Sequence, residues 1–232
     1  MTVHDTAKQL PEIPVLLDHC RAMAMVEAIL DPEGTERYHS FDSTWSETEE
    51  TALMRDGSGD EYAVVFCPAG AYIRGFAHES PMSPYEADDA DTVWPGVLDD
   101  VPEAFRPQVE EPAFSDEEGI PVVTACLWRE SGDDRWRAGT IEFPESDEGV
   151  EPDEYVADPD GAASLFRLLA DRSAESYREW AADYYDRPVD LAAVRHIFAM
   201  LPLTAEVVRA LNSDLTLDDL AEDIQEIGYP AA

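Results

Sequence analysis

The hydrophobic pattern changes its period near residue 35, and this change limits the possible folds more than any other feature. In residues 15–31 apolar side chains recur at helical spacing, and Asp31 followed by Pro32 ends the pattern, because the residue before a proline disfavours helical backbone. Residues 35–76 instead hold short segments rich in aromatic and β-branched side chains, separated by turn residues. This order predicts one helix followed by several antiparallel strands.

Turn residues divide the strand-like part of the chain into hairpins. Residues 56–60 (DGSGD) separate two of the early segments, and residues 68–70 (PAG) separate the next pair. Residues 121–130 and 135–143 have the same composition and are separated by SGDD, so they predict a further hairpin. The expected fold class is therefore α+β: an N-terminal helix packed on an antiparallel sheet of five or six strands, followed by a helical C-terminal part.

The last part of the chain has helical periodicity, and an acidic segment precedes it. After residue 160 apolar side chains recur at intervals of three and four. The expected organisation is a helix-plus-sheet unit over 1–143 with a long acidic, proline-rich loop at 77–119, an acidic linker at 144–160 and a helical part at 161–232. A shared core for the two parts is the alternative, because the linker is short and several apolar helix faces need cover.

Acidic residues outnumber basic ones by a wide margin. The 232 residues include 52 Asp and Glu and 15 Lys and Arg, for a net charge of -37, and Lys8 is the single lysine. With 44% hydrophobic residues and 8 Phe, 9 Tyr and 5 Trp, the composition favours a folded chain over a disordered one. The charge repels nucleic-acid phosphates and anionic lipids and attracts basic proteins and divalent cations. Neither nucleic acid nor a membrane is an expected partner.

No segment of the sequence indicates secretion, membrane insertion or a bound cofactor. The first residues, MTVHDTAKQLPEIP, lack a basic start followed by an apolar run, and no apolar segment approaches about 18 residues. Cys20, Cys67 and Cys126 are far apart in apolar segments, so reduced thiols are expected. The turn at 56–60 departs from a calcium-binding loop at Glu61 and Cys67. We expect a cytoplasmic protein without metal or cofactor, and its oligomeric state is left open.

Two clusters of acidic residues are candidates for binding a basic partner. In the proline-rich loop the cluster accompanies Trp94, which could serve as an exposed anchor; its members are Asp88, Asp89 and Asp91. A second cluster falls on the outer face of the last helical segment; its members are Asp218, Asp219, Glu222, Asp223 and Glu226. Like charges four residues apart on a helix repel by a few tenths of a kcal/mol, and a cationic partner would relieve that repulsion. A solvated surface without a partner is the alternative.

A second set of residues could carry catalysis. His78 and Glu79 directly follow a predicted strand, where sites are commonly built, and Arg74 near the end of that strand could contact an anion. Glu27 lies within the apolar stripe of the first helix, with His19 at its edge, so these two could form a general base or a ligand pair. The alternatives are structural: His78 ties the loop to the sheet, and arginine or backbone amides hold Glu27. Neither a G-x-S-x-G elbow nor an H-E-x-x-H metal motif surrounds these residues.

The charge and its clustering favour a non-enzymatic binding protein of the inhibitor or immunity type, which docks on a basic protein partner. Two alternatives stay open. One is a small hydrolase or metal-assisted enzyme that uses His78 and Glu79. The other is a housekeeping protein of a salt-adapted cell, in which the acidic residues serve only to bind water.

Overall fold

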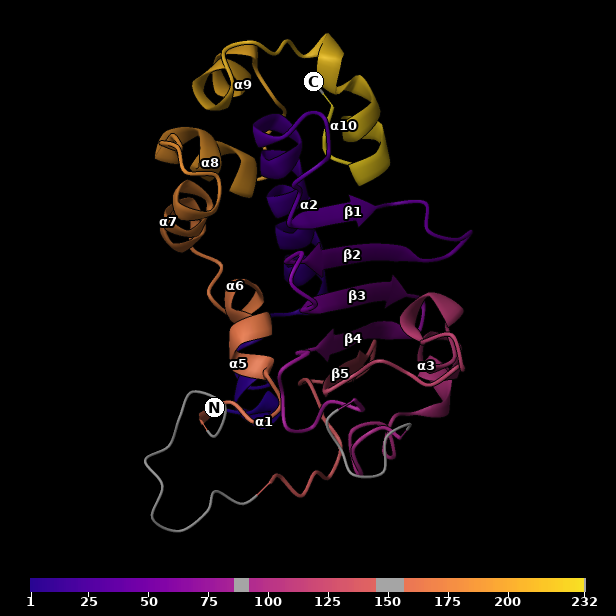
Figure 1. The fold of residues 1–232 in the computed structure, drawn as a ribbon. Helices are drawn as coiled ribbons and strands as arrows, with labels where there is room; N and C mark the ends of the chain where they lie inside the picture. The colour runs from indigo at the N-terminus through magenta and orange to yellow at the C-terminus, as the bar shows by residue number, and fades with distance from the viewer. Residues whose placement is uncertain (86–91, 145–156, 232) are drawn as a thin grey trace.

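The computed structural model describes residues 1–85, 92–144 and 157–231. Within them, five strands form one antiparallel sheet in which each strand pairs with its neighbours along the chain (Figure 1). The strands are β1 (His39–Asp42), β2 (Glu50–Arg55), β3 (Glu61–Cys67), β4 (Gly70–Phe76) and β5 (Ala125–Glu130). The predicted α+β class, with a first helix, an antiparallel sheet and C-terminal helices, is confirmed.

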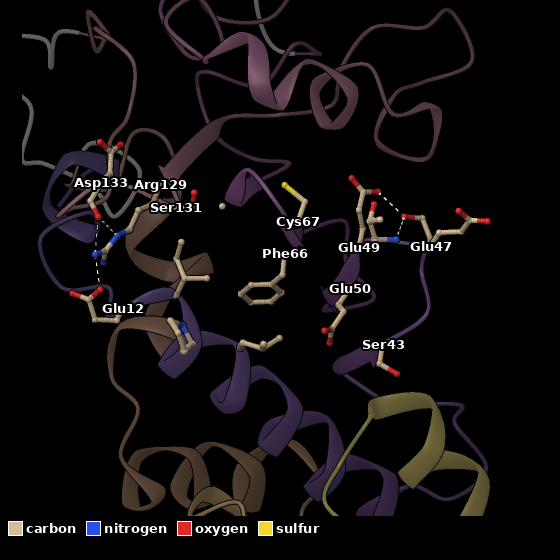
Figure 2. Close-up of a pocket in the computed structure, with 16 residues that line it drawn as sticks. Glu12, Ser43, Glu47, Glu49, Glu50, Phe66, Cys67, Arg129, Ser131 and Asp133 are labelled. Atoms are coloured by element: carbon tan, nitrogen blue, oxygen red, sulfur yellow. Dashed lines mark hydrogen bonds and ion pairs between the residues drawn. The ribbon is translucent and has the colours of Figure 1, made fainter.

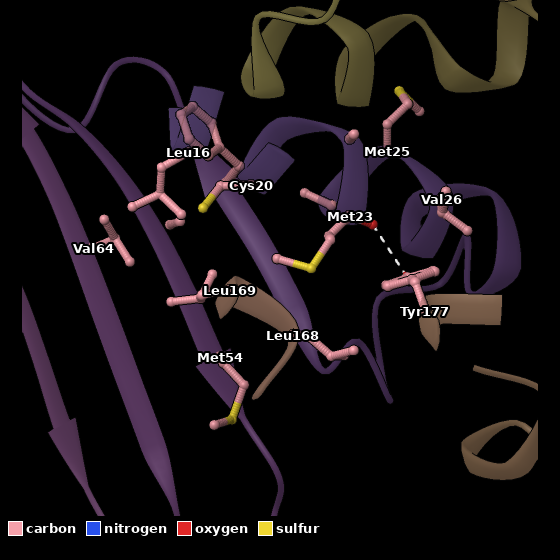
Figure 3. Packing of buried hydrophobic residues seen from close by; sticks show 14 of the residues in the cluster. Leu16, Cys20, Met23, Met25, Val26, Met54, Val64, Leu168, Leu169 and Tyr177 are labelled. Atoms are coloured by element: carbon pink, nitrogen blue, oxygen red, sulfur yellow. Dashed lines mark hydrogen bonds between the residues drawn. The ribbon is translucent and has the colours of Figure 1, made fainter. Parts of the chain in front are cut away.

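Helix α2 (Ile13–Leu30) lies at the centre of the structure. Its residues from 22 to 30 are all buried, which is typical of a helix that is covered on every side. Figure 3 shows Met23 of α2 with Met54 of β2 and Val64 of β3 in one apolar cluster. One face of the sheet therefore packs on α2. Helices that come later in the chain can pack on the remaining sides of α2.

The helices of the C-terminal part provide that cover (Figure 1). In the described residues, the helices before and after the sheet, besides α2, are α1 (Val3–Thr6), α5 (Ala162–Leu165), α6 (Arg167–Ala170), α7 (Ala174–Tyr184), α8 (Leu191–Phe198), α9 (Ala205–Leu211), η3 (Asp218–Leu220) and α10 (Ala221–Ile227). Helices α8, α9 and α10 each contact α2, and α10 also contacts β1. One cluster of buried residues consequently extends from Val3 to Tyr229. No helix in the described ranges is both long and apolar enough to cross a membrane.

The segment between β4 and β5 covers the second face of the sheet. In the part of this segment that the structure describes, the short helices are η1 (Glu103–Phe105), α3 (Arg106–Val109) and η2 (Pro112–Phe114). Phe105 stacks on Tyr72 of β4, with ring centroids 6.2 Å apart, and Phe114 packs against β3. Burial on both faces explains why β3 and β4 are apolar almost throughout. In a strand with one solvent-exposed face, apolar and polar residues would alternate.

The predicted strand at 135–143 is wrong. Among the described residues of this segment, only Arg137 pairs with the sheet, through an isolated antiparallel bridge to Trp128 of β5. The chain then leaves the sheet because Gly139 lies against the backbone of Gly96, where a β-carbon would come within 1.9 Å of a carbonyl oxygen. The described sheet consequently has five strands and not six.

Candidate functional site

A groove of about 740 Å³ opens at one end of the sheet. Its walls come from the start of α2, the loop between β1 and β2, the turn between β3 and β4, and the end of β5 (Figure 2). Apolar side chains of Ile13, Leu17 and Phe66 form part of the lining. The lining also contains five carboxylates and one guanidinium, those of Glu12, Glu47, Glu49, Glu50, Asp133 and Arg129. An apolar surface is thus bordered by acidic side chains.

Three glutamates lie at one end of the groove (Figure 2). Glu47 is exposed and has no hydrogen-bond or ion-pair partner in the described part of the chain. Glu49 accepts a hydrogen bond from the Gln108 side-chain amide at 2.5 Å. Glu50 forms an ion pair with Arg21. Arg21 is thus the one cation paired with these three glutamates among the described residues, and this end of the groove carries a net negative charge.

Arg129 lies at the other end and is only 6% exposed. Its Nη2 contacts Glu12 Oε2 at 2.5 Å, and its Nε and Nη2 donate to the carbonyl oxygen of Asp133 at 3.2 and 3.0 Å. The Asp133 carboxylate accepts two hydrogen bonds from Arg137, at 3.0 and 3.1 Å, and this contact lowers the pKa of Asp133. Both carboxylates at this end thus already have cationic partners.

Cys67 is the cysteine that reaches the groove. Its side chain is partly exposed, whereas Cys20 and Cys126 are buried. Burial raises the pKa of Cys126 to about 12, and it also raises the pKa of Cys20. Because the thiolate is the reactive form, a thiol reagent in neutral solution should modify Cys67 and spare the other two.

Glu226, one of the acidic residues predicted on the last helical segment, lies next to the groove, and none of the five predicted residues lines it. Ser43, which lines the groove, donates its amide to the carbonyl oxygen of Glu226 at 2.8 Å. Asp223 forms an ion pair with Arg37 at 2.6 Å. The exposed members of this cluster are Asp218, Asp219, Glu222 and Glu226. Figure 2 shows α10 next to Ser43.

The other predicted acidic cluster, formed by Asp88, Asp89 and Asp91, lies outside the described residues. Trp94 is described and is half-buried, and its Nε1 donates to the carbonyl oxygen of Glu142 at 3.0 Å. Its ring packs against the buried residues on the second face of the sheet. Trp94 therefore attaches the proline-rich loop to the segment that follows β5.

His78 and Glu79 lie together just beyond β4. His78 Nδ1 is 2.7 Å from Asp60 Oδ1, and the His78 amide donates to the same oxygen at 2.8 Å. The side-chain hydrogen bond with Asp60 is the main cause of a raised pKa for His78. His78 Nε2 is 4.0 Å from Glu79 Oε1, and Asp60 and Glu79 line a hollow of about 670 Å³ together with Arg167. An imidazole of fixed orientation is thus present beside this hollow.

Arg74 is held elsewhere, beneath the segment between β4 and β5. Its side chain is buried, forms an ion pair with Glu61 and donates to the carbonyl oxygen of Val122 at 3.0 Å. The guanidinium carbon also lies 4.8 Å from the centroid of the Phe114 ring. The anion that Arg74 contacts in this structure is therefore a carboxylate of the same chain.

Glu27 is completely buried where α2, β1 and the end of α7 meet. Its Oε1 is 2.5 Å from His39 Nδ1, and its Oε2 accepts from the Tyr185 hydroxyl at 2.6 Å and from the Tyr38 amide at 2.7 Å. His19, which helical spacing places at the edge of the same apolar stripe, donates its Nε2 to a backbone carbonyl of α6 at 2.8 Å and does not contact Glu27. Burial lowers the pKa of His19 to about 4. Glu27 thus belongs to a network that joins three elements.

None of the residues that line the groove is predicted from the sequence as a site residue. They come from four segments, and Glu12 and Asp133 are far apart in the chain. The one local signal is the acidic run ETEE at 47–50, which supplies the three glutamates at one end. The described residues contain no group of three or more His, Cys, Asp or Glu that could hold a metal ion.

Comparison with known proteins finds no matching family model, no matching curated protein and no matching solved structure. Function is therefore inferred from the geometry and the charge of the chain's own surfaces.

Proposed function

We propose that this chain is a non-enzymatic binding protein, of the inhibitor or immunity type, whose groove docks a basic segment of a partner protein. One observation carries the proposal: apolar side chains line a groove whose described border has five carboxylates and one guanidinium. A cationic segment with an apolar residue matches both parts of that surface. An acidic or purely polar segment matches neither.

The two parts of the groove would contribute differently to binding. Removing an apolar side chain of the partner from water supplies affinity, at roughly 25 cal/mol per Å² of buried surface. The carboxylates raise the rate of encounter with a basic partner and disfavour acidic ones. With a net charge of -37, the whole chain would attract any polycation, so the apolar surface of the groove is what adds selectivity.

Cys67 provides a direct test of this proposal, because it reaches the groove and is the most accessible thiol. The probe is a short capped peptide of alternating arginine and leucine, and the measurement is the rate at which a thiol reagent modifies Cys67. We expect the peptide to slow this modification at low ionic strength. A peptide with citrulline in place of arginine should protect less, and one with glutamate should not protect.

Two outcomes would count against the proposal. If the arginine-leucine peptide does not bind at low ionic strength, the docking function fails. If it binds while Cys67 reacts as fast as before, the peptide occupies another surface and the groove is not the docking site.

The hydrogen bond between His78 and Asp60 is the observation that favours a second candidate function, a small hydrolase. Asp60 orients the imidazole, and the adjoining hollow could hold a substrate. No serine, threonine or cysteine of the described ranges forms a hydrogen bond with this ring, so a hydrolase would have to activate water directly. Loss of a measurable ester or phosphoester hydrolysis on His78→Ala, with the fold intact, would support this candidate.

A further inference from the structure

The carboxylates of the groove are not equally available to a partner. Glu12 and Asp133 are engaged by Arg129 and Arg137. Because a carboxylate that already pairs with an arginine gains little from a second cation, the end of the groove at Arg129 offers a partner little uncompensated negative charge.

Glu50, at the opposite end, is likewise paired, with Arg21. This leaves two carboxylates of the lining without a cationic partner among the described residues, those of Glu47 and Glu49.

The surroundings of Glu49 fix its carboxylate without neutralising it. Gln108 donates to Oε1 at 2.5 Å, and the Ser46 hydroxyl donates to Oε2 at 3.3 Å. Both donors are uncharged, so the negative charge of Glu49 is uncompensated. Glu47 lies two residues away on the same loop, is exposed and makes no hydrogen bond within the described chain. A cation at this end of the groove would be attracted by both charges.

The groove is consequently asymmetric. Two uncompensated carboxylates lie at one end, Phe66 lies between the ends, and the other end is already charge-paired (Figure 2). We infer that the groove recognises a single arginine or lysine next to a bulky apolar residue, with Glu47 and Glu49 binding the cation and the apolar residue packing beside the partly exposed side chains of Ile13 and Leu17. This inference rests on the proposed docking function and assigns its specificity to two residues.

The test compares two double variants that lose the same charge. Glu47→Gln with Glu49→Gln removes the inferred pair and keeps an acceptor for Gln108. Glu179→Gln with Glu206→Gln is the matched control, because both residues are exposed on α7 and α9 and have no partner among the described residues. The probes are a capped peptide with one arginine next to one leucine in a serine-glycine background, and the same peptide with citrulline for arginine.

We expect the first double variant to bind the arginine peptide about tenfold more weakly than the parent, because two solvent-exposed ion pairs together contribute on this scale. The control should bind it nearly as well as the parent. The citrulline peptide should bind the parent and the first double variant equally weakly. Titration calorimetry gives the affinities, and Cys67 protection shows that the groove is occupied.

Failure of this inference differs from failure of the docking function. If the arginine peptide binds the parent and protects Cys67, but both double variants bind it equally well, the cation is held elsewhere and the assignment to Glu47 and Glu49 is overturned. If the arginine peptide does not bind the parent at all, the docking function itself is overturned.

Discussion

The Glu27 carboxylate joins segments that are far apart in the chain. It accepts from the His39 ring, the Tyr185 hydroxyl and the Tyr38 amide, and it is fully buried. Glu27→Ala would leave these donors without an acceptor, so we expect the free energy of unfolding to fall by on the order of 3 kcal/mol. Glu27→Gln keeps one acceptor and should lose less. Urea denaturation measures both, and an alanine variant as stable as the parent would contradict the structural role.

Asp160 gives a second prediction at the residue scale, because burial raises its pKa from 3.8 to about 6. Its carboxylate accepts from the amides of Val3 and Ala162 at 2.8 and 3.1 Å. The folded state holds the proton more tightly than the unfolded state, so this group stabilises the fold less as pH rises from about 4 to about 6, by roughly 3 kcal/mol in total.

Asp160→Asn tests this because the variant cannot titrate at that position. Its stability relative to the parent should increase between pH 4 and pH 7 by that same amount, roughly 3 kcal/mol, in addition to any constant cost of the lost acceptor. Denaturant unfolding at a series of pH values measures the difference. A difference that does not change with pH would show that Asp160 titrates normally in the folded state.

Individual site residues illustrate what a sequence can and cannot predict. Helical spacing places Glu27 in the apolar stripe, and the residue is indeed buried. Its partners His39 and Tyr185 could not be predicted, because contacts between separate elements leave no periodic signal in the sequence. The same reason hides the groove, in which Phe66 and Arg129 meet only after β5 joins the sheet.

Close packing of β4 on α5 and α6 leads to a prediction at the scale of elements. A β-carbon at Gly75 would lie 2.6 Å from Phe166 Cζ and 2.9 Å from Leu165 Cδ1, and the Phe166 ring is fully buried. Gly75→Ala should therefore destabilise the protein by about 1–3 kcal/mol through overpacking. Gly132→Ala is the control, because nothing lies within 4 Å of its β-carbon position. Equal unfolding midpoints for the two variants would show that the sheet moves away from these helices at little cost.

Most helices and strands could be predicted from the sequence. The exception is the strand predicted at 135–143, which is absent because of a contact between backbone segments. Aromatic and β-branched segments with turn residues between them identify β2, β3, β4 and β5, and a helical stripe identifies α2. Residues 135–143 have the same composition but leave the sheet, because Gly139 packs on the backbone of Gly96. A pattern of side chains cannot show that two glycine backbones come together.

For the whole molecule, the net charge of -37 predicts opposite effects of salt on stability and on binding. Self-repulsion of the carboxylates disfavours the compact state, and the screening length falls to about 3 Å at 1 M salt. The urea midpoint should therefore rise with added sodium chloride, while the affinity for the arginine-leucine peptide should fall. A midpoint that rises without any peptide binding would favour a salt-adapted protein that only binds water.

Helix α2 is made early, yet most of the helices that enclose it are made last. Its residues from 22 to 30 are buried by β1 and by α8, α9 and α10. During synthesis this apolar helix leaves the ribosome long before Leu191, where α8 begins. The growing chain consequently exposes part of this apolar helix until its last helices are made, and we expect chaperones that bind nascent polypeptides to cover it during that time.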